Sequence, residues 1–296
     1  MGVTTPSTAI YHIRPHHPGS LYMMPPKISV VTAVYNGEAY FSRAVPSILS
    51  QHYDDFEYII IDDGSTDKTP GFLSTVAERD SRVRILSPGR IGFVRALNLG
   101  ISHAKGEYVA RQDFDDLSYP DRFSTQADYL DAHPSVGVVG AAYILADDNR
   151  GERYTRTPPL EHRDIVKAMA KYIPLAHTLV MFRREAWTQA GGYPEVDDIE
   201  DLRLWISLAS LGWELANVPE ILGEHWVHGA SFWHQSFTYR HRQATLRKVQ
   251  RRAISRLELP FWMHIYPTSR TLYSLLPRAA KRIIRKSAGL SEQEVV

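Results

Sequence analysis

The segment from Ile28 to Val34, with the sequence ISVVTAV, is almost entirely apolar or β-branched and shows no polar alternation. Such a run is typical of a strand that is covered on both faces, as strands inside a parallel sheet are. A helical pattern of apolar residues at 41–49 follows, and the run from Tyr58 to Ile61 then indicates a second buried strand. This order of strand, helix and strand predicts a parallel sheet with crossover helices.

The alternation of strands and helices continues along the chain. We expect a short strand at 83–86, a helix at 94–103 and a further strand at 108–110. Farther on, the pattern indicates a buried strand at 179–182 and a helix at 199–211. The predicted fold class is therefore α/β, a layered domain with helices on both faces of a mostly parallel central sheet.

Composition limits the kinds of site that the chain can carry. Its 296 residues are 44% hydrophobic, which is enough for a substantial core. The absence of cysteine excludes disulfides, a thiolate zinc site and a cysteine nucleophile, and it fits a reducing compartment. No apolar run approaches the ~20 residues of a membrane-spanning helix. Residues 1–26 lack an apolar core, so we expect a flexible N-terminal extension rather than a signal peptide.

The net charge of +1 hides a strongly basic C-terminal segment. From Arg240 onward there are thirteen Lys or Arg and three Glu, so the rest of the chain holds 21 basic and 30 acidic residues. Apolar residues recur at helical spacing around 246–257, and a second amphipathic stretch begins at Pro277. These helices either lie on anionic lipid or pack on the main domain with a solvated basic face. Without zinc-finger spacing or an RNA-binding aromatic signature, we expect no nucleic-acid partner.

Three aspartates stand close together in the sequence Asp113-Phe114-Asp115-Asp116, directly after the strand at 108–110. Such close like charges repel one another unless a cation lies among them. Alternation points Asp113 and Asp115 to one side and Phe114 toward the core. Carboxylate oxygens without nearby cysteine or histidine in the sequence suit Mg²⁺ or Mn²⁺ rather than zinc. The alternative is a solvated acidic turn that leads into the next helix.

A second candidate carboxylate is Asp201, in the first turn of the helix at 199–211. Asp201, Trp205 and Leu208 share one face of this helix. Partial burial beside large apolar groups would raise the basicity of the carboxylate to a range useful for proton abstraction. The alternative is that the acid only complements the helix dipole.

Two common nucleotide-binding signatures are absent: no GxGxxG follows the first strand, and there is no GxxxxGK[ST] loop. The motifs present resemble, in this order, those of the family 2 inverting glycosyltransferases of the GT-A fold, over residues 27–231. They are VVTAVYNGE from Val30, SILSQ from Ser47, IDDGSTD from Ile61, GEYVA from Gly106 leading into Asp113-Phe114-Asp115, and Glu200-Asp201 before Leu204-Trp205.

The resemblance implies a role for each matching residue. Tyr35 and Asp63 are expected to line the pocket for the nucleotide base, and Asp113 to lie near the ribose. Asp115 is expected to hold the metal, Mn²⁺ or Mg²⁺, that bridges the two phosphates. Asp201 is expected to be the base that takes the proton from the acceptor hydroxyl.

Further positions follow from the same resemblance. His177 and Glu200 are expected among the residues that bind the nucleotide sugar, and His228 to approach the diphosphate or the metal. The chain departs from the family pattern at Trp226, where arginine is usual, and at Phe114, where a small residue is common.

The resemblance also implies the domain organisation. A GT-A catalytic domain is expected at 27–235, with a nucleotide-binding half at 27–116 and an acceptor half at 117–235. Residues 236–296 are the basic, helical C-terminal extension. The choice of sugar and acceptor is expected to lie in loops between Ala142 and Tyr193.

The function implied is a metal-dependent inverting glycosyltransferase that moves a sugar from a nucleotide sugar, a UDP-hexose, to a hydroxyl of a glycan or lipid-linked acceptor in surface polysaccharide biosynthesis. The QxxRW signature of processive synthases is absent, so one sugar is added per encounter. The expected location is cytoplasmic, peripheral on the inner face of the plasma membrane. Two alternatives stay open: a sugar-nucleotide nucleotidyltransferase, and a catalytically silent module that binds nucleotide sugars.

Overall fold

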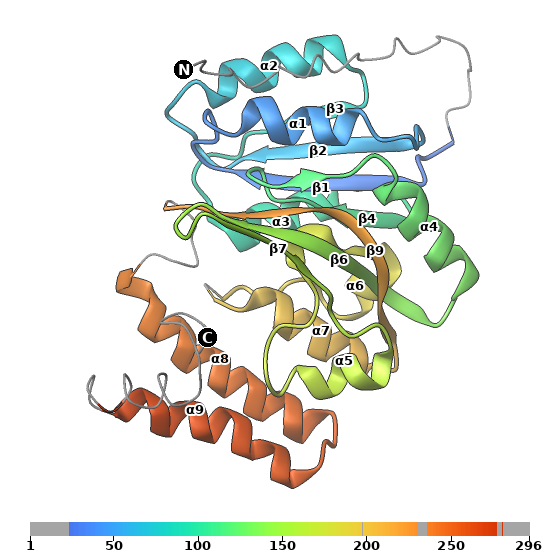
Figure 1. Cartoon of the computed structure of the whole chain (residues 1–296). Helices are drawn as coiled ribbons and strands as arrows, with labels where there is room; N and C mark the ends of the chain where they lie inside the picture. The colour runs from blue at the N-terminus through green and yellow to red at the C-terminus, as the bar shows by residue number, and fades with distance from the viewer. Residues whose placement is uncertain (1–23, 197, 230–235, 277–279, 281–296) are drawn as a thin grey trace, which may run out of the picture.

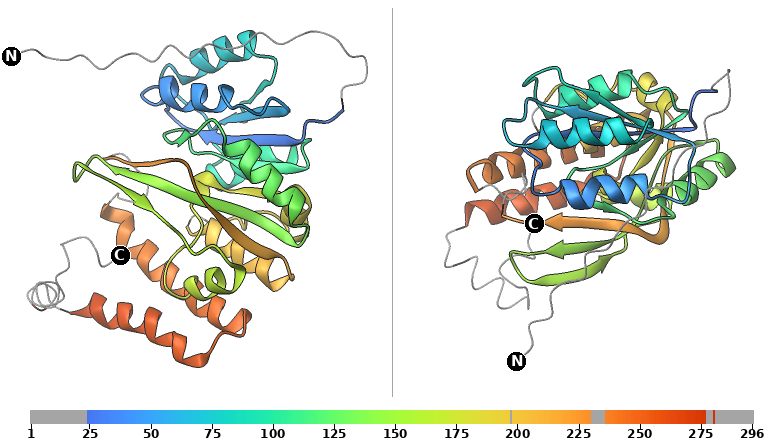
Figure 2. Two further views of the ribbon diagram at one scale, coloured as in Figure 1. Left: turned by 45° about the vertical axis from the view of Figure 1, so that its right-hand side comes forward. Right: turned by 90° about the horizontal axis from the view of Figure 1, so that it is seen from above.

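The computed structural model describes residues 24–196, 198–229, 236–276 and 280. Within them, nine strands form one twisted sheet, helices cover both of its faces, and the helices α8 (Ser236–Arg256) and α9 (Ile265–Leu275) lie beside it (Figure 1). Two further views show the same layers, with α8 and α9 side by side (Figure 2). The expected α/β class is confirmed.

The strands are, in chain order, β1 Ile28–Val34, β2 Phe56–Asp62, β3 Val83–Leu86, β4 Tyr108–Arg111, β5 Leu117–Ser118, β6 Val136–Asp147, β7 Glu152–Arg156, β8 Met181–Arg183 and β9 Glu214–Val227. The helices are α1 Phe41–Leu49, α2 Thr69–Arg79, α3 Phe93–Ser102, α4 Arg122–Ala132, α5 His162–Ala168, α6 Arg184–Gln189, α7 Glu200–Ser210, α8 Ser236–Arg256 and α9 Ile265–Leu275, with 3-10 turns η1 His177–Leu179 and η3 Phe261–His264. The elements expected in the first half of the chain are all present, within two residues of their expected ends.

The strand order is β3-β2-β1-β4-β8-β6-β9-β5, and β7 pairs with β6 at the side. The first four strands are parallel, as are β6 and β9, whereas β8 runs antiparallel to both of its neighbours. Counted by paired residues, most of the sheet is parallel, as expected. The carboxyl ends of β2, β1 and β4 therefore lie along one edge of the sheet.

The sheet has a separate apolar core on each face, because successive strand residues point to opposite sides. In β1, Val30 belongs to the core under α1, α2 and α4, whereas Val31 belongs to the core under α3, α5 and α7. The same alternation separates Ile60 from Ile59 in β2. All four of these side chains are fully buried, which explains the unbroken apolar runs in the sequence.

One expectation in the second half of the chain was wrong in detail. The buried strand expected at 179–182 begins only at Met181, because residues 177–179 form the 3-10 turn η1, where Thr178 accepts a hydrogen bond from the Asp113 N–H (3.1 Å). The region between Ala142 and Tyr193, whose loops were expected to carry the choice of sugar and acceptor, also contains the β6–β7 hairpin, α5, β8 and α6. Long-range pairing of β6 with β9 organises this region, and such pairing leaves no local signal.

In the C-terminal segment, the helix expected around 246–257 lies within the longer helix α8. Leu246, Val249 and Ala253 of α8 are buried in the core that contains α7, so α8 packs on the main domain. Helix α9 was not expected from the sequence, and the stretch beginning at Pro277 lies outside the described residues, as do residues 1–23. Among the described helices, none combines the length and the apolar character needed to cross a bilayer.

Candidate active site

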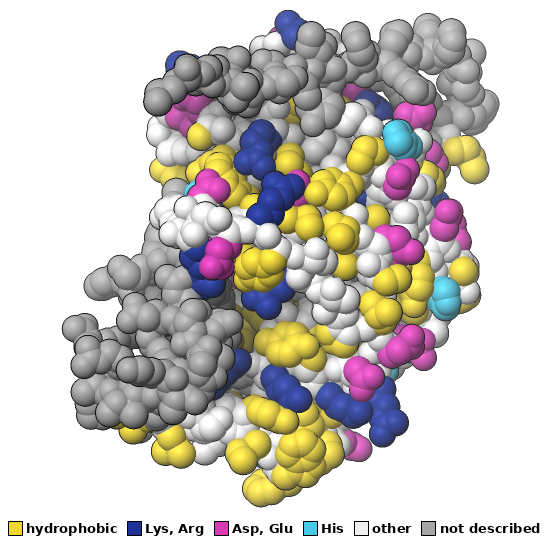
Figure 3. Space-filling model, in the orientation of Figure 1, with side chains coloured by type: hydrophobic (Ala, Val, Ile, Leu, Met, Phe, Trp, Pro, Cys, Tyr) yellow, Lys and Arg dark blue, Asp and Glu magenta, His cyan; other side chains and the backbone are white. Residues whose placement is uncertain are grey.

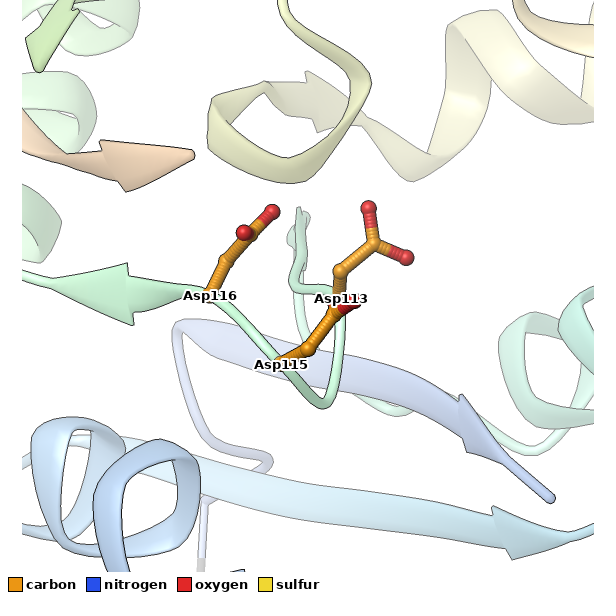
Figure 4. Close-up of side chains that lie close together, drawn as sticks. All are labelled: Asp113, Asp115 and Asp116. Atoms are coloured by element: carbon orange, nitrogen blue, oxygen red, sulfur yellow. The ribbon is translucent and has the colours of Figure 1, made fainter. Parts of the chain in front are cut away.

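The three aspartates lie in the turn between β4 and β5, and their carboxylates project to the same side of it (Figure 4). One oxygen of each of Asp113, Asp115 and Asp116 lies within 4.8 Å of the others. Phe114 points the opposite way: it is 5% exposed, and its ring centroid lies 6.3 Å from that of Phe41. The expected alternation is therefore confirmed, with two acids on the open side and the ring in the core.

Asp113 and Asp115 have different partners. Asp113 forms an ion pair with Arg111, whose guanidinium is fully buried at the end of β4. Asp115 Oδ2 lies 3.0 Å from His228 Nε2, and His228 Nδ1 lies 3.3 Å from the hydroxyl of Tyr40. Burial raises the pKa of Asp115, and the nearby charges of Asp116 and Asp113 raise it further against the effect of His228. A cation beside Asp115 would relieve this repulsion.

Asp116 has a structural role, which the sequence did not reveal. It is fully buried, and it accepts hydrogen bonds from the backbone N–H of Trp226 (2.7 Å) and from His225 Nδ1 (3.0 Å). Burial alone would raise the pKa of Asp116, but the charge of His225 and these hydrogen bonds lower it. In turn Asp116 raises the pKa of His225 to about 9, against the opposing effect of burial. This ion pair attaches the end of β9 to the turn.

The ligand set fits a hard divalent cation. Asp116 is committed to β9, which leaves Asp113, Asp115 and the imidazole of His228 as the donors nearest the open side. Carboxylate oxygens with one imidazole and no thiolate suit Mn²⁺ or Mg²⁺.

Trp226, at which the resemblance led us to expect arginine, lies within an aromatic cluster. Its ring centroid is 4.6 Å from that of His228 and 5.6 Å from that of Tyr40. The guanidinium carbon of Arg43, from α1, lies 4.5 Å from the centre of the Trp226 ring. A positive charge is therefore present beside this cluster although residue 226 is not basic.

Glu200 and Asp201 lie in the first turn of α7, after Ile199, whose left-handed conformation (φ 62°) redirects the chain into the helix. Burial raises the pKa of Asp201 to about 6, although its carboxylate accepts a hydrogen bond from the Leu202 N–H (2.7 Å). Burial and the charge of Asp201 together raise the pKa of Glu200 to about 8. The two neighbours therefore differ in protonation near neutral pH, with Glu200 mostly neutral and Asp201 mostly ionised.

His177 lies next to this pair. Its Nε2 is 2.7 Å from the hydroxyl of Tyr193, and its Nδ1 is 3.5 Å from Glu200 Oε1. Burial, with a smaller contribution from the charge of Arg111, holds the pKa of His177 well below its ordinary value. The imidazole is therefore neutral, and it supports Glu200 and Tyr193 without adding charge.

The charge of Arg111 acts on acids from both places: Asp113 in the turn after β4, and Glu200 and Asp201 in α7. Arg111 is paired with Asp113, and its charge lowers the pKa values of both Glu200 and Asp201. The charge of Asp113 in turn raises the pKa of Asp201. Asp113 and Asp201, which are 88 positions apart in the chain, thus share one electrostatic environment. The only sequence signal for Arg111 is a basic residue that ends an apolar strand.

Tyr35 and Asp63 follow β1 and β2 on the same edge of the sheet. Asp63 is buried and accepts hydrogen bonds from the N–H groups of Ile91 (2.7 Å) and Gly92 (2.9 Å). It also pairs with Arg90 (2.6 Å), whose guanidinium carbon lies 3.5 Å from the centre of the half-exposed Tyr35 ring. Asp63 therefore positions the loop that leads into α3.

A family model described as "Glycosyl transferase family 2" matches residues 29–189. A Bacillus subtilis protein named glycosyltransferase EpsE is 33% identical over 280 residues, which cover 91% of this chain and 99% of EpsE. The amylovoran biosynthesis glycosyltransferase AmsE of Erwinia amylovora is 32% identical over 200 residues, which cover 66% of this chain and 74% of AmsE.

Solved structures show the same fold. The mannosyltransferase PcManGT from Pyrobaculum calidifontis, in complex with GDP-Man and Mn²⁺, superposes with a TM-score of 0.62 at 19% identity, covering 90% of this chain and 80% of that one. Residues 1–349 of S. aureus TarS, in complex with UDP-GlcNAc, superpose with a TM-score of 0.66 at 15% identity, covering 86% and 77%.

Proposed function

This chain belongs to glycosyl transferase family 2 and is a glycosyltransferase, and we propose that it is metal-dependent and inverts the anomeric centre of the sugar it transfers. The observation that supports the proposal is the charge of Arg111, which pairs with Asp113 and also lowers the pKa of Asp201. We propose on this basis that a cation site and a base from separate parts of the chain act on one substrate. Such a pair is what a single displacement requires.

Asp115 is proposed as the main ligand of the cation, with His228 beside it and Asp113 toward the ribose. When bound, Mn²⁺ or Mg²⁺ would neutralise the charge that develops on the departing diphosphate. Tyr40 and Trp226 pack around His228, so they keep its imidazole directed at Asp115.

Asp201 is proposed as the general base. Its pKa of about 6 leaves the carboxylate ionised at neutral pH and still basic enough to accept the proton of an acceptor hydroxyl. The hydroxyl oxygen forms a bond with the anomeric carbon as the bond to the diphosphate oxygen breaks on the opposite face. Glu200, neutral near pH 7, is proposed to donate a hydrogen bond to the sugar or the acceptor, supported by His177.

The donor is proposed to be a nucleotide sugar, a UDP-hexose, with its base near Tyr35 and Asp63. The UDP-GlcNAc bound by TarS supports a uridine donor, and the Mn²⁺ of PcManGT supports manganese. The acceptor is proposed to be a hydroxyl of a glycan or lipid-linked sugar. The name of AmsE, which refers to amylovoran biosynthesis, supports a role in surface polysaccharide synthesis.

The proposed domain boundaries separate the residues that would bind the nucleotide from those that would bind the acceptor. Residues 27–116 would bind the nucleotide and 117–235 the acceptor, with 236–296 as a basic extension. The protein is proposed to add one sugar per encounter and to act at the cytoplasmic face of a membrane.

A screen of nucleotide sugars with Mn²⁺ tests the proposal, with release of nucleoside diphosphate as the readout. Once a donor is found, Asp201→Asn should lower kcat by about 10²- to 10⁴-fold, the range of general-base catalysis, and leave donor affinity within a factor of about two. Asp128→Asn, an exposed aspartate on α4, is the matched control and should behave as the unaltered protein.

Two outcomes would support the alternatives. Binding of nucleotide sugars without turnover, in the presence of glycolipid acceptors, would indicate a silent binding module. Release of pyrophosphate from a nucleoside triphosphate and a sugar phosphate would indicate a nucleotidyltransferase.

A further inference from the structure

The segment formed by η3 and α9 exposes an unusual amount of apolar surface. Phe261 is 85% exposed, Trp262 62%, Ile265 60% and Leu272 62%. Ile265 and Leu272 are seven residues apart and share one side of α9, and η3 extends this strip at its N-terminal end. Hydrophobic side chains gather at the lower edge of the space-filling view, where α8 turns into α9 (Figures 1 and 3). Contiguous exposed apolar residues of this kind mark interaction surfaces.

The exposed strip belongs to a firmly packed element. Met263, between the exposed aromatics and α9, is 2% exposed and packs with Ala170 and Ile254. Arg251 of α8 donates a hydrogen bond to Thr271 of α9 (3.1 Å). The apolar side chains therefore face outward from a fixed backbone.

Positive charge accompanies the apolar strip. Residues 236–276 contain eight Lys or Arg and one Glu. On α8, which packs against α9, four of these side chains are exposed: Lys248, Arg251, Arg252 and Arg256. The ammonium of Lys171 also lies near α9, 4.7 Å from the centre of the Tyr266 ring.

A second copy of the chain is a poor partner for this surface, because a symmetric contact would bring two strongly basic segments together. An anionic lipid surface meets both features at once. Trp and Phe side chains prefer the boundary between headgroups and acyl chains, and each basic residue near an anionic leaflet adds about 1 kcal/mol of attraction.

We propose that η3 and α9 form a membrane-docking surface, in which Phe261, Trp262 and Ile265 enter the interface of an anionic bilayer while the basic side chains of α8 contact its headgroups. This surface differs from the one expected from the sequence, which lay on the amphipathic helices around 246–257 and from Pro277 onward. It does not depend on which reaction the chain catalyses.

Co-sedimentation of the full-length protein with vesicles tests the proposal. The unaltered chain should bind vesicles of phosphatidylcholine mixed with phosphatidylglycerol, bind pure phosphatidylcholine weakly, and lose binding as salt is raised. The triple variant Phe261→Ser, Trp262→Ser and Ile265→Ser should partition at least about 10-fold less, because it loses the apolar side chains that would be buried in the bilayer interface. Leu211→Ser, which removes an apolar side chain that is 49% exposed at the end of α7, is the matched control.

Three results would overturn the proposal. The unaltered chain could fail to bind the mixed vesicles, or the triple variant could bind them as well as the control does. Analytical ultracentrifugation could instead show that the unaltered chain self-associates and that the triple variant is monomeric, which would assign the surface to a second copy. Unchanged thermal unfolding of the triple variant would establish that it is folded, and the vesicle readout is separate from any transferase assay.

Discussion

The phenyl ring of Phe114 lies directly against Gly37: a β-carbon added at Gly37 would be 2.5 Å from Phe114 Cδ1. The turn after β1 and the acidic turn after β4 therefore fit together only because residue 37 has no side chain. Phe114 lies between Asp113 and Asp115 in the chain, so a displacement of its ring that shifts its backbone also moves both carboxylates.

Gly37→Ala should accordingly weaken the metal-diphosphate site. Overpacking of this kind typically costs about 1–3 kcal/mol, and here part of the cost should appear as a shift of the acidic turn. We expect lower thermal stability and weaker binding of UDP with Mn²⁺, measured by titration calorimetry. Gly71→Ala, in α2, is the control, since an added β-carbon there meets no atom within 4 Å. Equal UDP affinity in both variants would show that the ring and the turn are not coupled.

Substitution of Asp115, the proposed metal ligand, should impair Mn²⁺ binding and activity more than substitution of His228 beside it. Asp115→Ala should abolish the stabilisation that Mn²⁺ with UDP gives to thermal unfolding, and it should lower kcat/KM by more than about 100-fold. His228→Gln removes the imidazole that lies 3.0 Å from Asp115 Oδ2, and it should lower the apparent Mn²⁺ affinity by about 10- to 100-fold. Asp128→Ala, on the exposed side of α4, is the control and should leave kcat/KM and the apparent Mn²⁺ affinity unchanged.

Activity should depend on pH through Asp201. Because burial raises the pKa of this carboxyl to about 6, the fraction of ionised base, and with it kcat/KM, should fall about tenfold per pH unit below that value. A pH profile measured at saturating Mn²⁺ would show this acid limb. If the residual activity of Asp201→Asn keeps the same limb, another group is the base.

Stability should depend on pH through Glu200. Its pKa rises from 4.5 to about 8 in the folded protein, mainly through burial, so the folded state holds its proton more tightly than the unfolded state does. The corresponding stabilisation is complete at pH values below 4.5 and is lost as the pH rises through 8.

The variant Glu200→Gln keeps the shape of the neutral acid and does not titrate. Its melting temperature should therefore exceed that of the unaltered protein, and this excess should be larger at pH 8 than at pH 5. Each kcal/mol of difference in unfolding free energy corresponds to a few degrees. Glu220→Gln, an exposed residue of β9, provides the control and should show no such divergence. Parallel curves for Glu200→Gln and the unaltered protein would contradict the assigned burial effect.

The sequence by itself determined the parts of this protein that depend on local pattern. The unbroken apolar runs of β1 and β2 predicted buried parallel strands, and the alternation at Asp113, Phe114 and Asp115 predicted which side chains face the open side. The reason is that side-chain direction in a strand repeats every two residues whatever the rest of the chain does.

Only the tertiary structure decided which distant groups meet. Asp115 contacts His228, 113 positions away, and the charge of Arg111, which pairs with Asp113, also lowers the pKa of Asp201 in the first turn of α7. The raised pKa of Glu200 and the outward-facing aromatic side chains of η3 could not be predicted from the sequence for the same reason. Burial and charge at these positions come from contacts between elements far apart in the chain, and no short stretch of sequence carries that information.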